Sequence, residues 1–185
     1  MSKITYLSYY DAISEPKTRA LIAACTEAIT QTKPDELYFL FSSTGGLVDA
    51  SVTLYNYLRA LPIPLTMHNT GSIASVANVV FLAADHRFAA PHSSFLLHGL
   101  TWSFGQGVTL TWSQLQETVG AFRGSEARVT GIIKERTSLT DAELTALFHQ
   151  GETKDLAFAK AKGIIQDVRP ASVPQGAPFF ALNFP

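Results

Sequence analysis

A serine and a histidine, each next to a small-residue turn, could together perform nucleophilic catalysis. Ser75 stands in the segment Gly71–Ala77, where small residues leave a serine little hydrophobic role. We expect it in the first turn of a helix over 73–84, whose N-terminus favours negative charge beside it. His98 closes an expected strand over 94–98 and is followed by glycine. A serine nucleophile activated by a histidine base is the chemistry of acyl transfer.

Local sequence alone leaves other interpretations of these two residues open. Ser75 can be a small polar residue in a tightly packed helix, and a lone histidine is more often structural than catalytic. The G-x-S-x-G elbow of α/β-hydrolases is excluded, because Ile73 and Ala77 stand where that motif has glycine. The remaining histidines show no metal-ligand spacing, so we expect no metal and no cofactor; they are His68, His86, His92 and His149.

Two glycine turns are expected to place unpaired backbone N–H groups near the serine. Gly45-Gly46 and Gly71 each stand between an expected strand and an expected helix. Turns of this kind direct backbone N–H groups into a shared crevice, where they can bind an anion or a developing oxyanion.

The elements that carry these residues alternate between strand and helix. Short β-branched or apolar runs predict strands, and apolar residues at helical spacing predict helices. The strands are expected over 4–10, 37–41, 65–68, 87–89, 94–98 and 163–168, and the helices over 14–31, 48–60, 73–84, 141–148 and 155–162. This alternation predicts an α/β fold with a mainly parallel sheet.

One long helix and one proline-rich segment complete the expected organisation. An amphipathic stretch over 111–136 predicts a helix that protrudes as an arm, about 109–138, and packs on another subunit. The alternative is that it folds back on its own domain. We expect a single domain over 1–169 and a loosely ordered, Pro-rich tail over 170–185.

Composition limits the classes of function. The 185 residues carry a formal charge of -1, with 46% hydrophobic and 16% charged residues, which is typical of a compact globular protein. Such a charge gives no electrostatic basis for binding nucleic acid or an anionic membrane. No signal peptide is visible and the longest apolar run is too short to span a bilayer, so we expect a cytoplasmic protein. The single cysteine, Cys25, is expected to be a buried hydrophobic residue.

Four segments resemble the Clp protease proteolytic subunits. The string LFSSTGGLV at 40–48 is similar to the strand and glycine turn of that family, and LYNYL at 54–58 to the helix that follows. The string GSIAS at 71–75 resembles its G-x-A-x-S nucleophile segment. The string PHSSFLLH at 91–98 resembles its segment ending in the catalytic histidine. Their order and spacing agree from about 4 to 168.

The resemblance implies a fold and a set of roles. The fold would be the ClpP/crotonase type, with repeated ββα units. Ser75 would be the nucleophile and His98 the general base, and the N–H groups of Gly46 and Val76 would form the oxyanion hole. The implied function is a serine endopeptidase in a ring-type, self-compartmentalising homo-oligomer that cleaves peptides or unfolded proteins.

The sequence also departs from the family pattern. No carboxylate falls at 147–150, where the resemblance places the third triad member. Glu152 and Asp155 are close, and Asp155 is more simply a helix N-cap. Thr44 replaces a proline, and Gly99-Leu100 replace Gln-Pro. Because the chain begins almost at its first strand, without the family's usual N-terminal extension, we do not expect an ATP-driven unfoldase partner.

Two other functions remain. A crotonase-type acyl-CoA enzyme would use paired backbone N–H groups without a serine nucleophile. A catalytically silent scaffold would keep the assembly and lack turnover, which is compatible with the missing aspartate.

Overall fold

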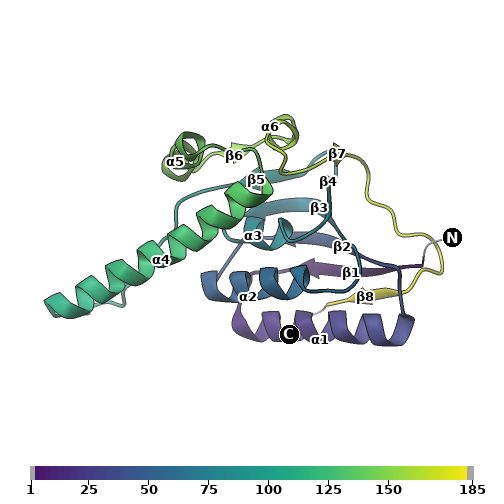
Figure 1. Cartoon of the computed structure of the whole chain (residues 1–185), viewed down its shortest axis with the longest axis horizontal. Helices are drawn as coiled ribbons and strands as arrows, with labels where there is room; N and C mark the ends of the chain where they lie inside the picture. The colour runs from purple at the N-terminus through teal and green to yellow at the C-terminus, as the bar shows by residue number, and fades with distance from the viewer. Residues whose placement is uncertain (1–2, 183–185) are drawn as a thin grey trace.

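The computed structural model describes residues 3–182 and forms a helix-covered sheet (Figure 1). The strands are β1 (Ile4–Tyr10), β2 (Glu36–Ser43), β3 (Leu65–Ala74), β4 (His86–Ala89), β5 (Ser94–Leu96), β6 (Thr153–Lys154), β7 (Asp167–Val168) and β8 (Phe179–Ala181). The helices are α1 (Glu15–Thr32), α2 (Val48–Arg59), α3 (Ala77–Phe81), α4 (Trp112–Arg136), α5 (Asp141–Gln150) and α6 (Leu156–Ala161).

The sheet is mainly parallel, as predicted. Its main path runs β6-β5-β3-β2-β1-β8, with β4 also pairing β3 and β7 pairing β4. Within the described chain, only the β5–β6 pair is antiparallel. Parallel strands are joined by crossovers, and the helices of those crossovers cover the sheet.

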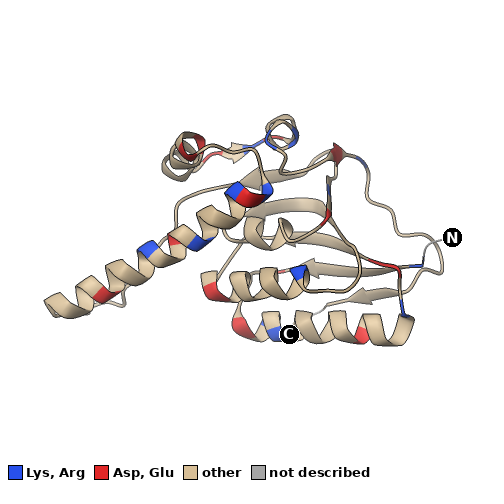
Figure 2. Ribbon diagram, in the orientation of Figure 1, with Lys and Arg blue, Asp and Glu red and all other residues tan. Residues whose placement is uncertain are grey.

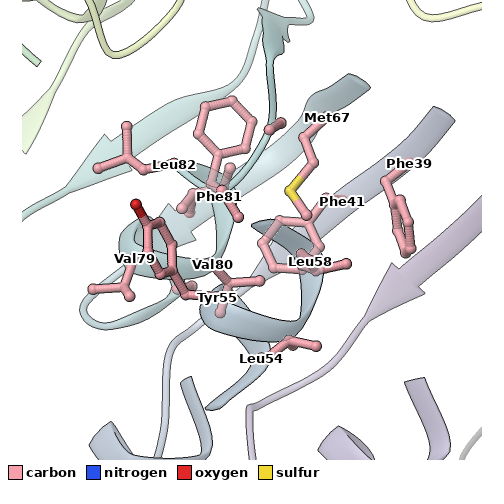
Figure 3. Close-up of a cluster of buried hydrophobic side chains, with 14 of the residues drawn as sticks. Phe39, Phe41, Leu54, Tyr55, Leu58, Met67, Val79, Val80, Phe81 and Leu82 are labelled. Carbon is pink, nitrogen blue, oxygen red and sulfur yellow. The ribbon is translucent and has the colours of Figure 1, made fainter. Parts of the chain in front are cut away.

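The hydrophobic core lies between this sheet and the helices α1, α2 and α3. Alternate strand residues such as Phe39, Phe41 and Met67 are fully buried because successive side chains of a strand point to opposite faces. Figure 3 shows Leu54 and Leu58 of α2 in the same cluster as Phe41 and Met67. Cys25 on α1 is buried, as predicted, and burial raises the pKa of its thiol to about 12.

Strand β3 is longer, and the helix after it shorter, than predicted. The turn expected at Gly71 is a continuation of β3, which ends at Ala74 and pairs with β5 from Ser72 onward. The hydroxyl of Ser42 supports this continuation, because it accepts from the Ser72 N–H and donates to the Ser72 carbonyl. The helix α3 therefore has only five residues, Ala77–Phe81.

The Pro-rich end is partly built into the sheet. The prediction of a loosely ordered tail is wrong for Phe179–Ala181, which form β8 and pair in parallel with Tyr6–Ser8 of β1. In Figure 1 the chain between β7 and β8 runs to the edge of the sheet formed by β1. The pairing was not visible in the sequence because the strand is only three residues long and stands among prolines.

The arm helix α4 protrudes from the body, as predicted. Thr111 and Gln114 form a capping box at its start. Of its side chains, Val129 and Ile133, both near its C-terminal end, are buried. Figure 1 shows its N-terminal half extending beyond the sheet, and Figure 2 shows charges of both signs along it. The alternative in which α4 folds back along its whole length is therefore not observed.

Two arginines, the buried Arg87 and the half-buried Arg136, join the base of α4 to the sheet. The guanidinium of Arg87 donates to carbonyl oxygens of Ala84, Ile164, Arg136 and Gly163. Arg136 donates to the carbonyl oxygens of Leu82 and Ala84. These bonds satisfy the carbonyl groups left over where α3 and α4 end and fix the direction in which the arm leaves the body.

Candidate active site

Three neighbouring parallel strands end at the same edge of the sheet and deliver the predicted site residues there. The registers pair Ser43 of β2 with Ile73 of β3, and Ala74 of β3 with Leu96 of β5. Ser75 is therefore the first residue beyond β3, and His98 is the second beyond β5. Gly45-Gly46 follow the end of β2. Ligands of parallel α/β sheets bind at this carboxyl edge.

Ser75 stands in a strained turn rather than in the first turn of a helix. Its φ is 57°, a left-handed value that is uncommon for residues other than glycine. The backbone N–H of Ser75 donates to the Leu96 carbonyl at 2.9 Å, which holds the turn against β5. Strained backbone that the surroundings hold in place is typical of functional positions. The Ser75 side chain is half-buried at the strand end.

Gly45 passes so close to this turn, and Gly46 so close to Ile13, that no side chain fits at either position. A Cβ on Gly45 would lie 2.6 Å from the Cβ of Ser75, and a Cβ on Gly46 would collide with the Ile13 carbonyl. Both have positive φ, 94° and 150°. Only glycine tolerates this combination, so the Gly45-Gly46 turn lies directly against Ser75.

The two predicted oxyanion donors are unoccupied by other parts of the fold. Leu47 donates to the Ile13 carbonyl, and Ile13 donates to the Gly45 carbonyl. Within residues 3–182, the N–H groups of Gly46 and Val76 make no backbone hydrogen bond. Free N–H groups on both sides of a serine are what stabilisation of a tetrahedral oxyanion requires.

Asn78 is a site residue that sequence reasoning missed. Its side-chain Nδ2 donates to the carbonyl oxygens of Ser75 and Leu96, both at 2.9 Å. Asn78 is 1% exposed, so these bonds are shielded from water. They hold the turn at Ser75 against the end of β5, two residues before His98. A polar residue inside the apolar run 76–84 was the available signal.

His98 is half-buried, and its ring is held by the next residue. The Nδ1 atom lies 2.7 Å from the Gly99 carbonyl oxygen. A carbonyl only accepts, so Nδ1 carries the proton and Nε2 is the basic nitrogen. Within the described chain, no hydrogen bond joins the ring to the Ser75 hydroxyl. Catalytic hydrogen bonds often form only when substrate is bound.

Among the hydrogen bonds and ion pairs of residues 3–182, none joins His98 to Glu152 or Asp155, the two candidates for the third triad member. Glu152 pairs with Lys154 at 2.9 Å. The carboxylate of Asp155 accepts from the Phe158 N–H and caps α6, as its position predicts. Residues 147–150, where the third triad member is expected, do lie near the histidine, because the Phe148 carbonyl accepts from the Gly99 N–H at 3.1 Å. This contact is made by backbone atoms and supplies no carboxylate.

A cleft of about 790 Å³ begins at Gly46 and is lined on one side by residues of α4. Its apolar lining includes Val48, Leu100, Trp102 and Phe122. Glu15, Asp49 and Arg128 add charge to it, and Arg128 pairs with Asp49 at 2.7 Å. Gly46 is the predicted site residue that lines this cleft; Ser75 and His98 are not among its lining residues.

The family model described as "Clp protease" matches residues 2–171. The chain belongs to the Clp protease family. Among its curated relatives, the ATP-dependent Clp protease proteolytic subunit 1 of Chlamydia trachomatis is 31% identical over 133 residues, which are 67% of this chain and 67% of that protein. Proteolytic subunit 2 of Treponema denticola is 33% identical over 88 residues, or 46% of this chain and 42% of that protein.

A solved structure shows the same fold. A point mutant of ClpP1 from Listeria monocytogenes matches with a TM-score of 0.76, covering 90% of this chain and 91% of its own, at 16% identity. The predictions of a Clp serine-peptidase family and of a ClpP-like α/β fold are confirmed. Within residues 3–182, none of the helices combines the length and hydropathy that a bilayer span needs.

Proposed function

We propose that this Clp family member hydrolyses peptide bonds through an acyl-enzyme on Ser75, with His98 as general base. The observation that supports it most is the β2–β3–β5 register. It brings a strained serine, a histidine and two unoccupied backbone N–H groups to one edge of the sheet. These are the parts that acyl transfer to serine needs.

The chemistry follows from these positions. The Oγ of Ser75 attacks the scissile carbonyl while its proton passes to Nε2 of His98. The oxyanion that forms accepts from the N–H groups of Gly46 and Val76, each such donor being worth about 3 kcal/mol in the transition state. The imidazolium then returns the proton to the leaving amine, and water releases the acyl group by the same steps in reverse.

The proposed substrates are short peptides or unfolded protein segments, acted on in the cytoplasm. The cleft supports peptide substrates, because its lining combines apolar side chains with Gly46, a proposed oxyanion donor. The cytoplasmic location stays a prediction from the sequence.

The arm supports a homo-oligomer. Seven large hydrophobic side chains on α4 and the segment before it are exposed: Trp102, Phe104, Val108, Leu110, Trp112, Leu115 and Val119. An exposed apolar surface of this kind is typical of a protein interface. We propose that arms of several copies pack together in a ring-type assembly, and static light scattering at micromolar concentration should give a mass several times that of one chain. A single-chain mass would contradict this.

The activity test compares two serines of the same strand region. A mixture of fluorogenic peptides should be cleaved by the wild-type chain and by Ser72→Ala, since Ser72 is an exposed serine three residues before the proposed nucleophile. Ser75→Ala should reduce turnover by about 10⁴-fold or more.

The same variants, tested with peptides and with acyl-CoA thioesters, separate the two other functions. A silent scaffold would cleave nothing in wild-type form. A crotonase-type enzyme would act on acyl-CoA thioesters, and that activity would survive Ser75→Ala.

A further inference from the structure

We propose that the backbone carbonyl of Gly99 is the group that orients His98 for catalysis, in the role that a side-chain carboxylate has in a Ser-His-Asp triad. This inference rests on the proposed function, since it concerns the base of that reaction. Gly99 O is a positioning group, because it acts on the substrate only through the imidazole.

The contact selects one tautomer of the ring. Nδ1 and the Gly99 oxygen are 2.7 Å apart, a short and therefore well-formed bond. Because the oxygen has no proton to give, the bond exists only with the proton on Nδ1. The Nε2 lone pair is then left to accept the Ser75 proton. A triad carboxylate fixes the same tautomer.

The backbone that leads into this carbonyl is anchored at two points. The Gly99 N–H, in the preceding peptide group, donates to the Phe148 carbonyl at 3.1 Å, which attaches residue 99 to the end of α5. Further back, Asn78 and Ser75 bond the carbonyl of Leu96, two residues before His98. An orienting group must be fixed to select one ring position, and these bonds restrict the backbone on both sides of His98.

Glycine at position 99 is part of the arrangement. A Cβ there would lie 3.3 Å from the Phe148 carbonyl oxygen, closer than an ordinary contact. The φ of Gly99 is not in the left-handed region, so alanine is permitted by the backbone and would act through this contact alone. Gly99→Ala is therefore a mild displacement of the orienting carbonyl.

A neutral acceptor stabilises an imidazolium less than a carboxylate does, because it lacks the opposite charge. It does keep the productive tautomer. Loss of that tautomer lowers kcat by about 10⁴-fold in the Asp→Asn variant of a serine protease triad. The expected enzyme is a functioning but slow peptidase.

The test reads the tautomer directly. The full chain is labelled with ¹⁵N-histidine, and the imidazole nitrogens are observed by NMR at about pH 8. The His98 signals are those missing from His98→Gln. The proposal predicts a protonated Nδ1 and a bare Nε2. A ring protonated on Nε2, or a mixture in which neither tautomer dominates, would overturn it.

A variant and a matched control add a second measurement. Gly99→Ala should shift the ring toward the Nε2-protonated form and slow the reaction of Ser75 with a fluorophosphonate roughly tenfold, as partial loss of a general base does. Gly131→Ala, where a Cβ meets nothing within 4 Å, should change neither. An unchanged tautomer and rate in a folded Gly99→Ala chain would contradict the proposal.

Failure of the two proposals can be distinguished. If Ser75 is labelled by the fluorophosphonate and His98 is protonated on Nε2, the proposed peptidase activity is supported and the proposed role of Gly99 is contradicted. An Nδ1-protonated ring without labelling would remove the peptidase and keep the contact, and the proposal of a catalytic role for Gly99 would be overturned with it.

Discussion

Asn78 joins the backbone of Ser75 to the strand that leads to His98. One buried amide group donates to the Ser75 and Leu96 carbonyls, so the relative position of the two proposed catalytic residues depends on it. Its Oδ1 has no hydrogen-bond partner within residues 3–182, so the two N–H donors make the hydrogen bonds of this side chain there. A buried polar group kept for its donors alone is expected at a position where geometry matters.

The isosteric change Asn78→Asp tests that role. It replaces both donors by acceptors that face two carbonyl oxygens, and leaving buried groups unpaired costs about 1–3 kcal/mol, more for a charge. We expect a loss of at least that size in urea unfolding, and slower fluorophosphonate labelling of whatever chain remains folded. Asn56→Asp, on the exposed side of α2, is the control and should change little. Equal stability of the two variants would refute this role of Asn78.

At the scale of elements, the sequence pattern predicted correctly those strands and helices whose bounds depend on the residues of the segment itself. The strand over 4–10 and the arm helix agree with β1 and α4 to within about a residue at each end, because alternation and helical periodicity are properties of the segment itself. The sequence predicts a turn at Gly71, because glycine usually interrupts a strand. It continues β3 because Ser42 and β5, distant in sequence, bond the backbone beyond it.

The site was predicted to a similar extent. The residue types of Ser75, His98 and Gly46 carry the family pattern, so the sequence sufficed to name them. The contacts of His98 with Gly99 and of Asn78 with two carbonyls are made with backbone atoms. A sequence shows side chains and gives no sign of which backbone carbonyl is turned toward them.

Two glycines, one inside a helix and one just after a helix, should respond to alanine with opposite sign. Gly131 lies inside α4 with open space around it, so Gly131→Ala should raise the free energy of unfolding by about 0.5–1 kcal/mol. Gly163 follows α6 with a φ of +69°, and Gly163→Ala should lower it by about 1 kcal/mol or more. Urea unfolding at one protein concentration measures both. The same sign for both variants would contradict this account of the helices.

At the scale of the whole molecule, a buried histidine ties the C-terminal segment to the sheet. His68 on β3 is 0% exposed. Its Nε2 donates to the Arg169 carbonyl at 2.9 Å, so Nδ1 accepts from the Tyr38 hydroxyl at 2.7 Å. The Arg169 guanidinium lies over the Phe88 ring. Burial lowers the pKa of His68 below its ordinary value of 6.5, because the charged ring would lose its hydration.

This histidine should make the fold sensitive to mild acid. The unfolded chain takes up the proton at a higher pH than the folded chain, so stability is complete above about pH 6.5 and falls as the pH drops below that value. The slope from one such group is at most about 1.4 kcal/mol per pH unit. We expect the loss between pH 8 and pH 5.5, measured by urea unfolding, to be smaller in His68→Gln. The exposed His92→Gln should retain the wild-type loss, and a wild-type loss in His68→Gln would contradict the assignment.

The central claim is that Ser75 is a nucleophile activated by His98, and covalent labelling tests it most directly. An alkyl fluorophosphonate forms a bond to an activated serine oxygen with loss of fluoride, and intact-mass and peptide mass spectrometry locate the adduct. We predict one adduct, on Ser75, in the wild-type chain and in Ser72→Ala. We predict none in Ser75→Ala, and a rate lower by about 10²-fold or more in His98→Ala. A wild-type chain that stays unlabelled under conditions that label another serine hydrolase, or that is labelled at a different residue, would contradict the claim.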